Sequence, residues 1–270
     1  MTPGLPTSDQ INAFRRDGAV HLPGAFAGEW AARLAAGVEV NRATPGPYAH
    51  EYAADGEGFF GDYCNWQRLD DFRAFVFESP AGEIAAALMG AGRVQFFHDH
   101  VLVKAPGALE ATPWHHDYPY YCLEATKTVS LWIALDPVPE AVSPCFVAGS
   151  HAWGKLFVPR YFKDGSAYPS AQGYEPVPDI DGHADDYQVL AWDMAPGDAI
   201  AFDFRTLHAA PGNPTAGARR AASMRWFGEG TTYAERPQPP SPPYPEMGID
   251  LKPGDPMPTD WFPVVWPRGT

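Results

Sequence analysis

Three side chains that can bind one metal ion from the same side are the most informative feature of the sequence. His115 and Asp117 are separated by one residue, and in an extended strand such residues project from one face. His208, at the end of a later apolar segment, is the candidate third ligand. Two histidines and one carboxylate form the facial set typical of non-haem Fe(II) oxygenases, which leaves three coordination positions open. A His-x-Asp tripeptide alone is common by chance, so the interpretation depends on the remaining chain.

Arg219, at the start of the strand that follows His208, is the candidate anchor for a cosubstrate. A 2-oxo acid would chelate two open positions through its keto oxygen and adjacent carboxylate, and O2 would take the last. Its far carboxylate needs a cation, and a planar guanidinium matches a carboxylate with two hydrogen bonds. Arg220 is the alternative anchor. Neighbouring strand residues face opposite ways, so only one of the two arginines reaches the site.

A second cluster, His98 and His100, competes with these ligands. Both lie on a predicted strand over residues 94–104 and share a face with Phe96 and Lys104. Direct metal binding by this pair is the alternative, and lining of the pocket is the preferred interpretation.

The elements that position these residues are mainly strands. Glycine and proline recur along the chain up to about residue 236 and indicate many turns between short strands. Helices are predicted only in the first third, over residues 8–17, 27–41 and 81–89. The pattern predicts a mainly β fold, a cupin-like jelly roll with flanking N-terminal helices.

A single domain over residues 1–270 is expected. Residues 1–92 form the helical flank, 93–228 the β core, and 229–270 a Pro-rich tail packed on the body. The aromatic segment 42–70 is either a lid over a pocket or a packed loop. Residues 152–187 are polar and are predicted to run over the surface.

The composition limits the kinds of molecule that the protein is expected to bind. The formal net charge of −14 argues against nucleic acid and anionic membranes as partners. The sequence has no basic cluster for the phosphates of CoA, which argues against a CoA thioester as substrate. The three cysteines lack metal-ligand spacing, and the sequence shows no apolar leader. Both observations favour a cytoplasmic location. We expect a small-molecule substrate, and the aromatic tail is a candidate homodimer contact.

Several short stretches occur together in a recognisable order. They are Trp114–Asp117, Ser130–Asp136, Gly149–His151, Pro196–Asp198, His208, Asn213 and Arg219–Arg220. In this order they resemble the phytanoyl-CoA dioxygenase family of Fe(II)- and 2-oxoglutarate-dependent oxygenases, from about residue 8 to residue 228. The resemblance implies a double-stranded β-helix in which His115, Asp117 and His208 bind iron. It also implies that Arg219 anchors 2-oxoglutarate and that Trp132 contacts it.

One departure from the family pattern concerns the cosubstrate. Many relatives have a hydroxyl two residues after the distal histidine, where this chain has Ala210. Another donor must then assist Arg219, and Lys104, His98 and His100 are the candidates. Asp117 is retained, which favours hydroxylation over halogenation.

The predicted function is hydroxylation of an unactivated C–H bond in a small, apolar organic molecule, with release of succinate and CO2. Desaturation, epimerisation or cyclisation at the same site is one alternative. Others are a cupin-like metal-binding protein without oxygenase activity and a zinc hydrolase with the same ligands.

Overall fold

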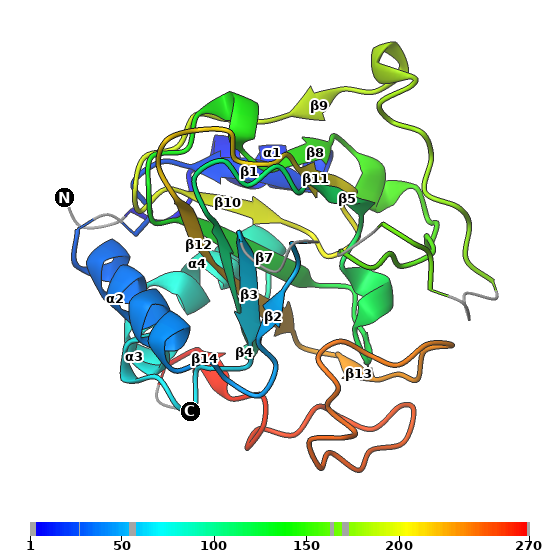
Figure 1. The fold of residues 1–270 in the computed structure, drawn as a ribbon. Coiled ribbons are helices and arrows are strands. Elements are labelled where there is room, and N and C mark those ends of the chain that lie inside the picture. Colours follow the sequence, from blue (N-terminus) through cyan, green and yellow to red (C-terminus); the bar gives the residue numbers. More distant parts are fainter. Residues whose placement is uncertain (1–3, 27, 54–57, 163–164, 169–172, 269–270) are drawn as a thin grey trace.

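A computed structural model describes residues 4–268, apart from residue 27 and the ranges 54–57, 163–164 and 169–172. Two antiparallel sheets form the core (Figure 1). The arrangement is the mainly β jelly roll that the sequence predicts, with helices added from the N-terminal part of the chain.

The larger sheet has eight strands and carries the central part of the fold. In spatial order they are β1 (Ala19–Leu22), β10 (Ala199–Phe202), β7 (Thr128–Ala134), β12 (Arg219–Gly228), β4 (Val94–Lys104), β3 (Phe59–Tyr63) and β2 (His50–Glu51), with β14 (Val264–Trp266) pairing with β4. Strands β4, β7 and β12 lie side by side although they are far apart in sequence. Tertiary pairing therefore assembles the inner face of this sheet.

The smaller sheet has four strands. They are β5 (Thr112–His115), β11 (His208–Ala210), β8 (Cys145–Val147) and β9 (Val189–Leu190). A separate pair joins β6 (Leu123–Glu124) and β13 (Thr232–Tyr233). In the small sheet His115 and His208 are direct cross-strand partners, which brings the two imidazoles together.

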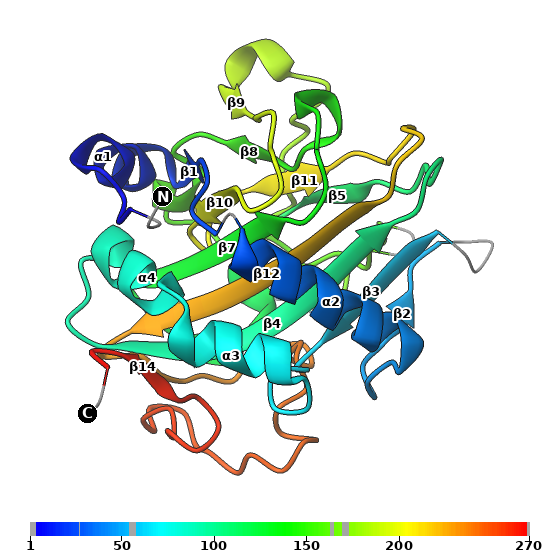
Figure 2. The ribbon, with the colours of Figure 1, turned by 90° about the vertical axis from the view of Figure 1, so that its left-hand side faces the viewer.

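Helices cover the outer face of the large sheet (Figure 2). They are α1 (Ser8–Asp17), α2 (Glu29–Ala43), α3 (Asp70–Glu78) and α4 (Ala81–Met89). Thr7 and Gln10 form a capping box at the start of α1, a helix that the sequence predicts, and Gly18 ends that helix at a φ of 76°. Buried helix residues such as Leu34 and Phe75 pack on the sheet in one hydrophobic cluster with Val101. This packing leaves the inner face of the sheet free for the site.

A β-bulge changes the predicted faces of β4. Arg225 pairs with His98, but the next residue, Trp226, pairs with Phe96, so Phe97 is the extra residue. Phe96 consequently packs with the helices, whereas Phe97 lies in a different cluster. The prediction that Phe96 shares a face with His98 is therefore wrong, because strand alternation does not continue through a bulge.

Two further segments differ from the sequence prediction. Helix α3 was not predicted, because Leu69 at its N-cap provides no capping side chain. The segment 42–70 is not loop throughout, since β3 within it pairs with β4. The part of this segment at residues 54–57 lies outside the described residues.

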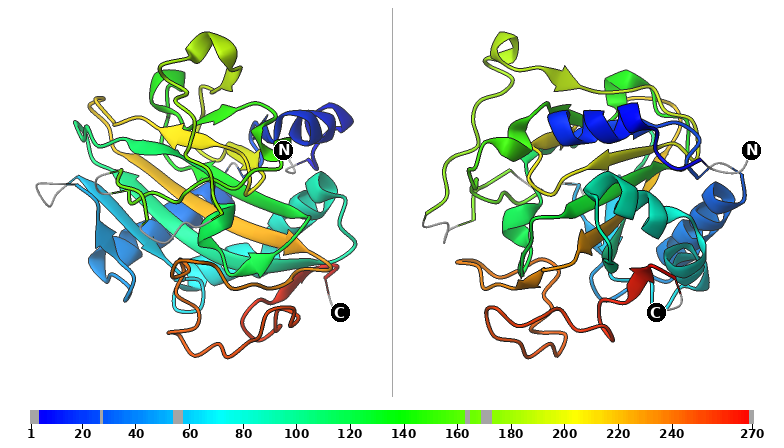
Figure 3. Two further views of the ribbon diagram at one scale, coloured as in Figure 1. Left: turned by 90° about the vertical axis from the view of Figure 1, so that its right-hand side faces the viewer. Right: turned by 180° about the vertical axis from the view of Figure 1, so that it is seen from behind.

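The C-terminal segment, orange to red in Figure 3, lies along the body of the protein. Its strand β14 pairs with β4, and the Gln95 side chain donates to the carbonyl oxygens of Met257 and Phe262. Among the described residues, no helix is long and apolar enough to cross a bilayer.

Candidate active site

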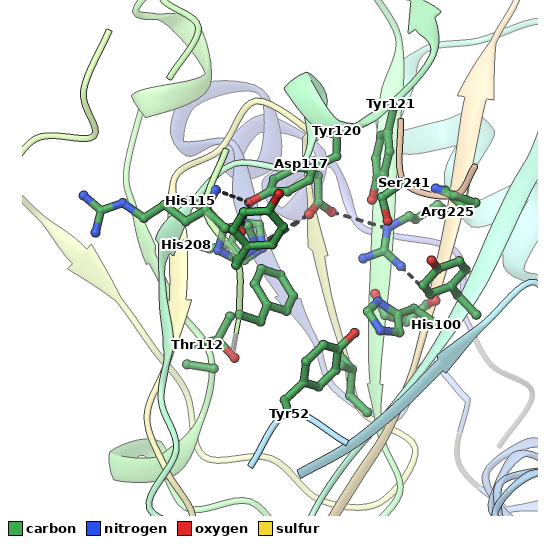
Figure 4. Close-up of a pocket in the computed structure, with 18 of the residues that line it drawn as sticks. Tyr52, His100, Thr112, His115, Asp117, Tyr120, Tyr121, His208, Arg225 and Ser241 are labelled. Carbon is green, nitrogen blue, oxygen red and sulfur yellow. Dashed lines mark hydrogen bonds and ion pairs between the residues drawn. The ribbon is translucent and has the colours of Figure 1, made fainter. Parts of the chain in front are cut away.

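His115, Asp117 and His208 converge on one point between the two sheets (Figure 4). One ligand atom of each lies within 4.8 Å of the others. Asp117 Oδ1 is 3.7 Å from Nε2 of His115 and 3.8 Å from Nε2 of His208. All three side chains are buried or nearly so. The predicted triad is therefore assembled in space.

The route to this geometry differs from the predicted one. Strand β5 ends at His115, and Asp117 has helical backbone angles ahead of a short 3-10 helix, Tyr118–Tyr120. Asp117 thus reaches the histidines from a turn and not from the same strand face. Alternation along one strand was the wrong reason for a correct grouping.

Each histidine is held in the form that a metal ion requires. Nδ1 of His115 is 2.8 Å from the carbonyl oxygen of Pro113, and Nδ1 of His208 is 2.9 Å from that of Thr206. A carbonyl only accepts, so Nδ1 carries the proton and Nε2 has a free lone pair. Burial lowers the pKa of His115 to about 3 and also lowers that of His208. Both imidazoles are therefore neutral near pH 7.

Asp117 has a cationic partner that the sequence analysis missed. Nε of Arg225 is 3.3 Å from Asp117 Oδ2, the oxygen opposite the one that faces the histidines. Burial opposes ionisation of Asp117, but the charge of Arg225 and then the two imidazoles outweigh it and lower its pKa. Asp117 is thus an anion with one oxygen held and one oxygen free to bind a metal.

A cavity of about 610 Å³ opens next to the triad. Side chains from both sheets line it, including His50 and Glu51 of β2, together with residues from two segments outside the sheets, 160–162 and 239–243. Most described residues in the range 152–187 are exposed or half-buried, as predicted for a surface segment, and part of this segment also closes the cavity. Most of the lining is aromatic or apolar, which suits an organic molecule with little charge.

Arg219 and Lys104 lie together beyond one end of the cavity and do not line it. They are cross-strand partners, and both donate to the carbonyl oxygen of Pro211. Arg219 also donates to the carbonyl of Val142, and Lys104 to that of Glu110. Within the described part of the chain, neither cation has a carboxylate partner. The two residues form a buried pair of basic side chains.

Burial has a large effect on these two cations. It lowers the pKa of Arg219 to about 10. Burial and the charge of Arg219 lower the pKa of Lys104 to about 6. Near pH 7 Arg219 is charged, and Lys104 is mostly neutral until an anion arrives.

His98 lies in a different part of the site from Lys104. Both are on the inner face of β4, but six residues of extended strand separate their Cα atoms by roughly 20 Å. A five-carbon dicarboxylate is much shorter than this span. His98 lines the cavity opposite Arg225, so the predicted cosubstrate contacts fall into two separate groups.

Trp132 lines the cavity from β7, next to Phe146 and Phe202 of the same hydrophobic cluster. Thr112 also lines it and was missed in the sequence analysis. Thr112 is the cross-strand partner of Ala210, the position where relatives have a hydroxyl. The hydroxyl group of Thr112 therefore lies near the position that a hydroxyl on residue 210 would occupy.

Other polar residues take structural roles. His116 is buried, and its Nε2 accepts from the backbone amide of Phe157 at 2.9 Å. Arg220 faces outward and pairs with Asp136 and Glu39, so it does not compete with Arg219. His151 contacts the backbone of Arg15 at the end of α1. Among the described residues, His115, Asp117 and His208 form the one group of three side chains that could together hold a metal ion.

Comparison with known families decides the assignment. A family model described as phytanoyl-CoA dioxygenase matches residues 14–221. The chain belongs to the phytanoyl-CoA dioxygenase family. It is accordingly an Fe(II)- and 2-oxoglutarate-dependent oxygenase, in agreement with the triad on the inner face of the jelly roll.

Solved structures show the same fold at low sequence identity. The α-ketoglutarate-dependent carbocyclase SnoK from nogalamycin biosynthesis has 24% identity and a TM-score of 0.78, with 98% of each chain covered. The epimerase SnoN, solved with Fe3+, α-ketoglutarate and nogalamycin RO, has 22% identity and a TM-score of 0.75, with 95% of this chain and 97% of SnoN covered. EctD from S. alaskensis, solved with 2-oxoglutarate and 5-hydroxyectoine, has 19% identity and a TM-score of 0.63, covering 83% of this chain and 76% of EctD. No curated protein matches the chain in sequence.

Proposed function

We propose that His115, Asp117 and His208 hold Fe(II), and that the enzyme hydroxylates a C–H bond of a small, apolar organic molecule. Succinate and CO2 are the products of the cosubstrate. The observation that carries the proposal is the convergence of three ligand atoms within 4.8 Å beside an apolar cavity. Two neutral imidazoles and one carboxylate are the donors that Fe(II) takes in enzymes of this type.

The donor set fits the metal in protonation as well as position. Both Nε2 lone pairs are free because each Nδ1 is engaged by a backbone carbonyl. Arg225 holds the second oxygen of Asp117, which favours binding through a single oxygen. Fe(II) with 2-oxoglutarate and O2, when bound, supplies the oxidising power that breaks an unactivated C–H bond.

We assign the far carboxylate of 2-oxoglutarate to Arg219, with Lys104 as its assistant. Both side chains are buried, and within the described chain both donate hydrogen bonds to backbone carbonyls and neither has a carboxylate partner. An anion at this end would balance charge that is otherwise uncompensated. Thr112 is placed to donate in the position of the missing hydroxyl at Ala210, and Trp132 would form the wall beside the cosubstrate.

The remaining contribution of the protein is to orient the substrate and exclude water. Tyr120, Tyr121 and Phe162 lie around the triad and provide flat apolar surfaces. A substrate held against them would present one C–H bond to the metal side of the cavity. Positioning of this kind determines which bond reacts.

A second candidate outcome uses the same site for cyclisation or epimerisation. It is favoured by the fold shared with a carbocyclase and an epimerase over nearly the whole chain. The two outcomes differ in product mass. Hydroxylation adds one oxygen atom, cyclisation or desaturation removes two hydrogen atoms, and epimerisation leaves the mass unchanged.

The decisive experiment is an anaerobic optical titration of the protein with Fe(II) and then 2-oxoglutarate. The weak visible metal-to-ligand charge-transfer band is expected to appear and to be lost in His115→Ala and His208→Ala. His151→Ala, a histidine outside the site, is the matched control and is expected to retain it. Absence of the band in folded, iron-loaded protein would favour the binding-protein or hydrolase alternatives.

We also propose a cytoplasmic location and a homodimer contact through the aromatic C-terminal tail. The acidic composition, with a formal net charge of −14, supports partners other than nucleic acid and anionic membranes. Sedimentation of the full chain and of a variant with Trp261→Ala tests the dimer, and a monomer in both would exclude it.

A further inference from the structure

A compact group of four polar side chains lies on the inner face of the large sheet, beside the triad. His98 and His100 come from β4, and Ser223 and Arg225 come from β12. Ser223 is the cross-strand partner of His100, and Arg225 is the partner of His98. Cross-strand partners project from the same face of a sheet. The four side chains therefore form a polar patch, and all four line the cavity.

This polar patch is buried but incompletely hydrogen-bonded. Between 1% and 9% of each residue's surface is exposed. Nε2 of His98, Nε2 of His100 and Oγ of Ser223 have no hydrogen-bond partner within the described chain. Buried polar groups in folded proteins are nearly always paired, so three unpaired groups on one patch indicate a missing partner.

The hydrogen-bonding character of the patch can be worked out from its partners. Nδ1 of His98 is 3.1 Å from the carbonyl oxygen of Asp99 and must carry the proton to make that bond. Burial lowers the pKa of His98 well below its usual value, so the ring is neutral. Its Nε2 is consequently an acceptor that requires a donor. Ser223 and Arg225 on the same patch are hydrogen-bond donors for an acceptor group of a bound molecule.

The patch offers no unshared cation to an additional anion. Arg225 is its single cation, and Nε of Arg225 already lies 3.3 Å from Asp117 Oδ2. A further buried carboxylate would have to share Arg225 with Asp117. A neutral hydroxyl group, which can both donate to Nε2 of His98 and accept from Ser223 or Arg225, meets the hydrogen-bonding requirement without this competition.

Aromatic rings surround the patch on the cavity side. The Tyr63 ring lies 6.5 Å from that of His98 and 5.7 Å from that of His100, in both cases edge to face. In Figure 4, Tyr52 and Tyr121 lie near His100 and Arg225, on the side away from His115. A flat ring system would fit between these faces while one of its substituents reaches the patch.

We propose that His98, His100, Ser223 and Arg225 form a substrate subsite for a hydroxyl substituent carried by a ring-bearing molecule. The proposal rests on the proposed function, because it places the substrate in the same cavity. It separates the two ends of the site: the cosubstrate lies toward Arg219, and the oxygenated ring of the substrate lies toward Arg225.

Three probes that share one ring system and differ in their substituent test the proposal. Naphthalene has no oxygen, 2-naphthol has one neutral oxygen, and 2-naphthoate has a charged carboxylate. Binding is measured by equilibrium dialysis against the anaerobic protein loaded with Fe(II) and 2-oxoglutarate. We expect 2-naphthol to bind about tenfold more tightly than either other probe, the gain of one or two buried hydrogen bonds.

Two variants and a matched control locate the effect. Ser223→Ala and His100→Phe each remove one polar group of the patch and are expected to reduce the 2-naphthol advantage to less than about threefold. Their affinity for naphthalene should change little, which also shows that the variants are folded. Ser79→Ala is the control. Its hydroxyl is likewise buried, but Ser79 lies between α3 and α4, donates to the carbonyl of Phe75 and does not line the cavity, so the full advantage should remain.

Equal binding of 2-naphthol and naphthalene, or an advantage that survives both variants, would overturn the proposal. Tightest binding of 2-naphthoate would also overturn it and would indicate an anion site. Failure of all three probes to bind would exclude a ring-binding subsite. The charge-transfer band separates this proposal from the proposed function. If the band appears but the protein binds the three probes equally, only the subsite proposal is contradicted. If the band does not appear, the proposed function is contradicted.

Discussion

Arg219 and Arg225 lie six residues apart on the same strand, and their side chains are buried to nearly the same extent, with 6% and 5% of each residue exposed. Their neighbours differ. Arg225 faces the carboxylate of Asp117, whereas Arg219 faces backbone carbonyls and the largely neutral Lys104. A buried cation with a carboxylate is balanced within the protein, and a buried cation without one is available for an anionic ligand. The comparison therefore supports the proposal that Arg219 binds the cosubstrate, whereas Arg225 is already paired with Asp117.

The largest effect is expected from Arg219→Met. The change removes a buried guanidinium that, unlike Lys104, is fully charged near pH 7, so the Kd of 2-oxoglutarate should rise by roughly 100-fold or more. Fe(II) affinity should stay within about twofold, because Arg219 does not contact the triad. Titration of the charge-transfer band measures the first quantity and competition with a chelator the second.

Arg220→Met is the matched control, since that side chain faces outward and pairs with Asp136. It should leave 2-oxoglutarate affinity unchanged. Equal losses in the two variants would show that general surface charge, and not the buried guanidinium, attracts the cosubstrate.

Arg225→Met is expected to affect the other ligand. Without Arg225, Oδ2 of Asp117 loses its partner, and the carboxylate is free to rotate, so Fe(II) affinity should fall by about 10- to 100-fold. Arg225→Lys keeps the charge without the planar donor group and should fall between wild type and Arg225→Met. If Arg225→Met retained wild-type iron affinity, the contrast between the two arginines would be lost.

The pKa of Lys104 predicts that the affinity for 2-oxoglutarate at the Arg219 end of the site depends on pH. This pKa is about 6 in the free protein, and a bound dianion would raise it. Between the free and bound pKa values, binding therefore takes up a proton. The affinity for 2-oxoglutarate should fall as pH rises from about 6.5 to 8.5, by at most about tenfold per pH unit for one proton.

Lys104→Met should remove this pH dependence while leaving Arg219 in place. Calorimetric titrations in two buffers with different ionisation enthalpies count the proton directly. A binding reaction without proton uptake in the wild-type protein would mean that Lys104 is not part of the anion site.

The smallest effect is expected from Thr112→Val, which keeps the side-chain shape and removes the hydroxyl. If this hydroxyl replaces the one absent at Ala210, the Kd of 2-oxoglutarate should rise by about two- to tenfold. Thr128→Val is a control for loss of a threonine hydroxyl that hydrogen-bonds Asp203 away from the cavity. An unchanged Kd in Thr112→Val would leave Arg219 and Lys104 as the only donors at this end.

The sequence allowed much of the chemistry to be predicted because some of its signals are local or come from a known pattern. Alternation along a strand separated Arg219 from Arg220, and the structure places them on opposite faces. The capping box at Thr7 and the helix that follows it were likewise predictable from neighbouring residues. The third ligand, His208, was identified from its place at a strand end and from the family pattern, not from local geometry.

Other features depend on contacts between distant segments. No local signal pairs Arg225 with Asp117, since 108 residues separate them. The bulge at Phe97 also depends on the register that β12 imposes on β4. The same holds for residues 160–162, whose polar surroundings indicated surface, although their side chains line the cavity.

By itself, then, the sequence determined which candidate ligands are present and that Arg219 and Arg220 face opposite ways, because side-chain alternation is a property of the local backbone. Only the tertiary structure decided how the buried charges are matched. Pairing of β4 with β12 places Lys104 beside Arg219 and His98 beside Arg225. Charge balance in a buried site depends on distances across strands, and those distances are set when the sheets assemble.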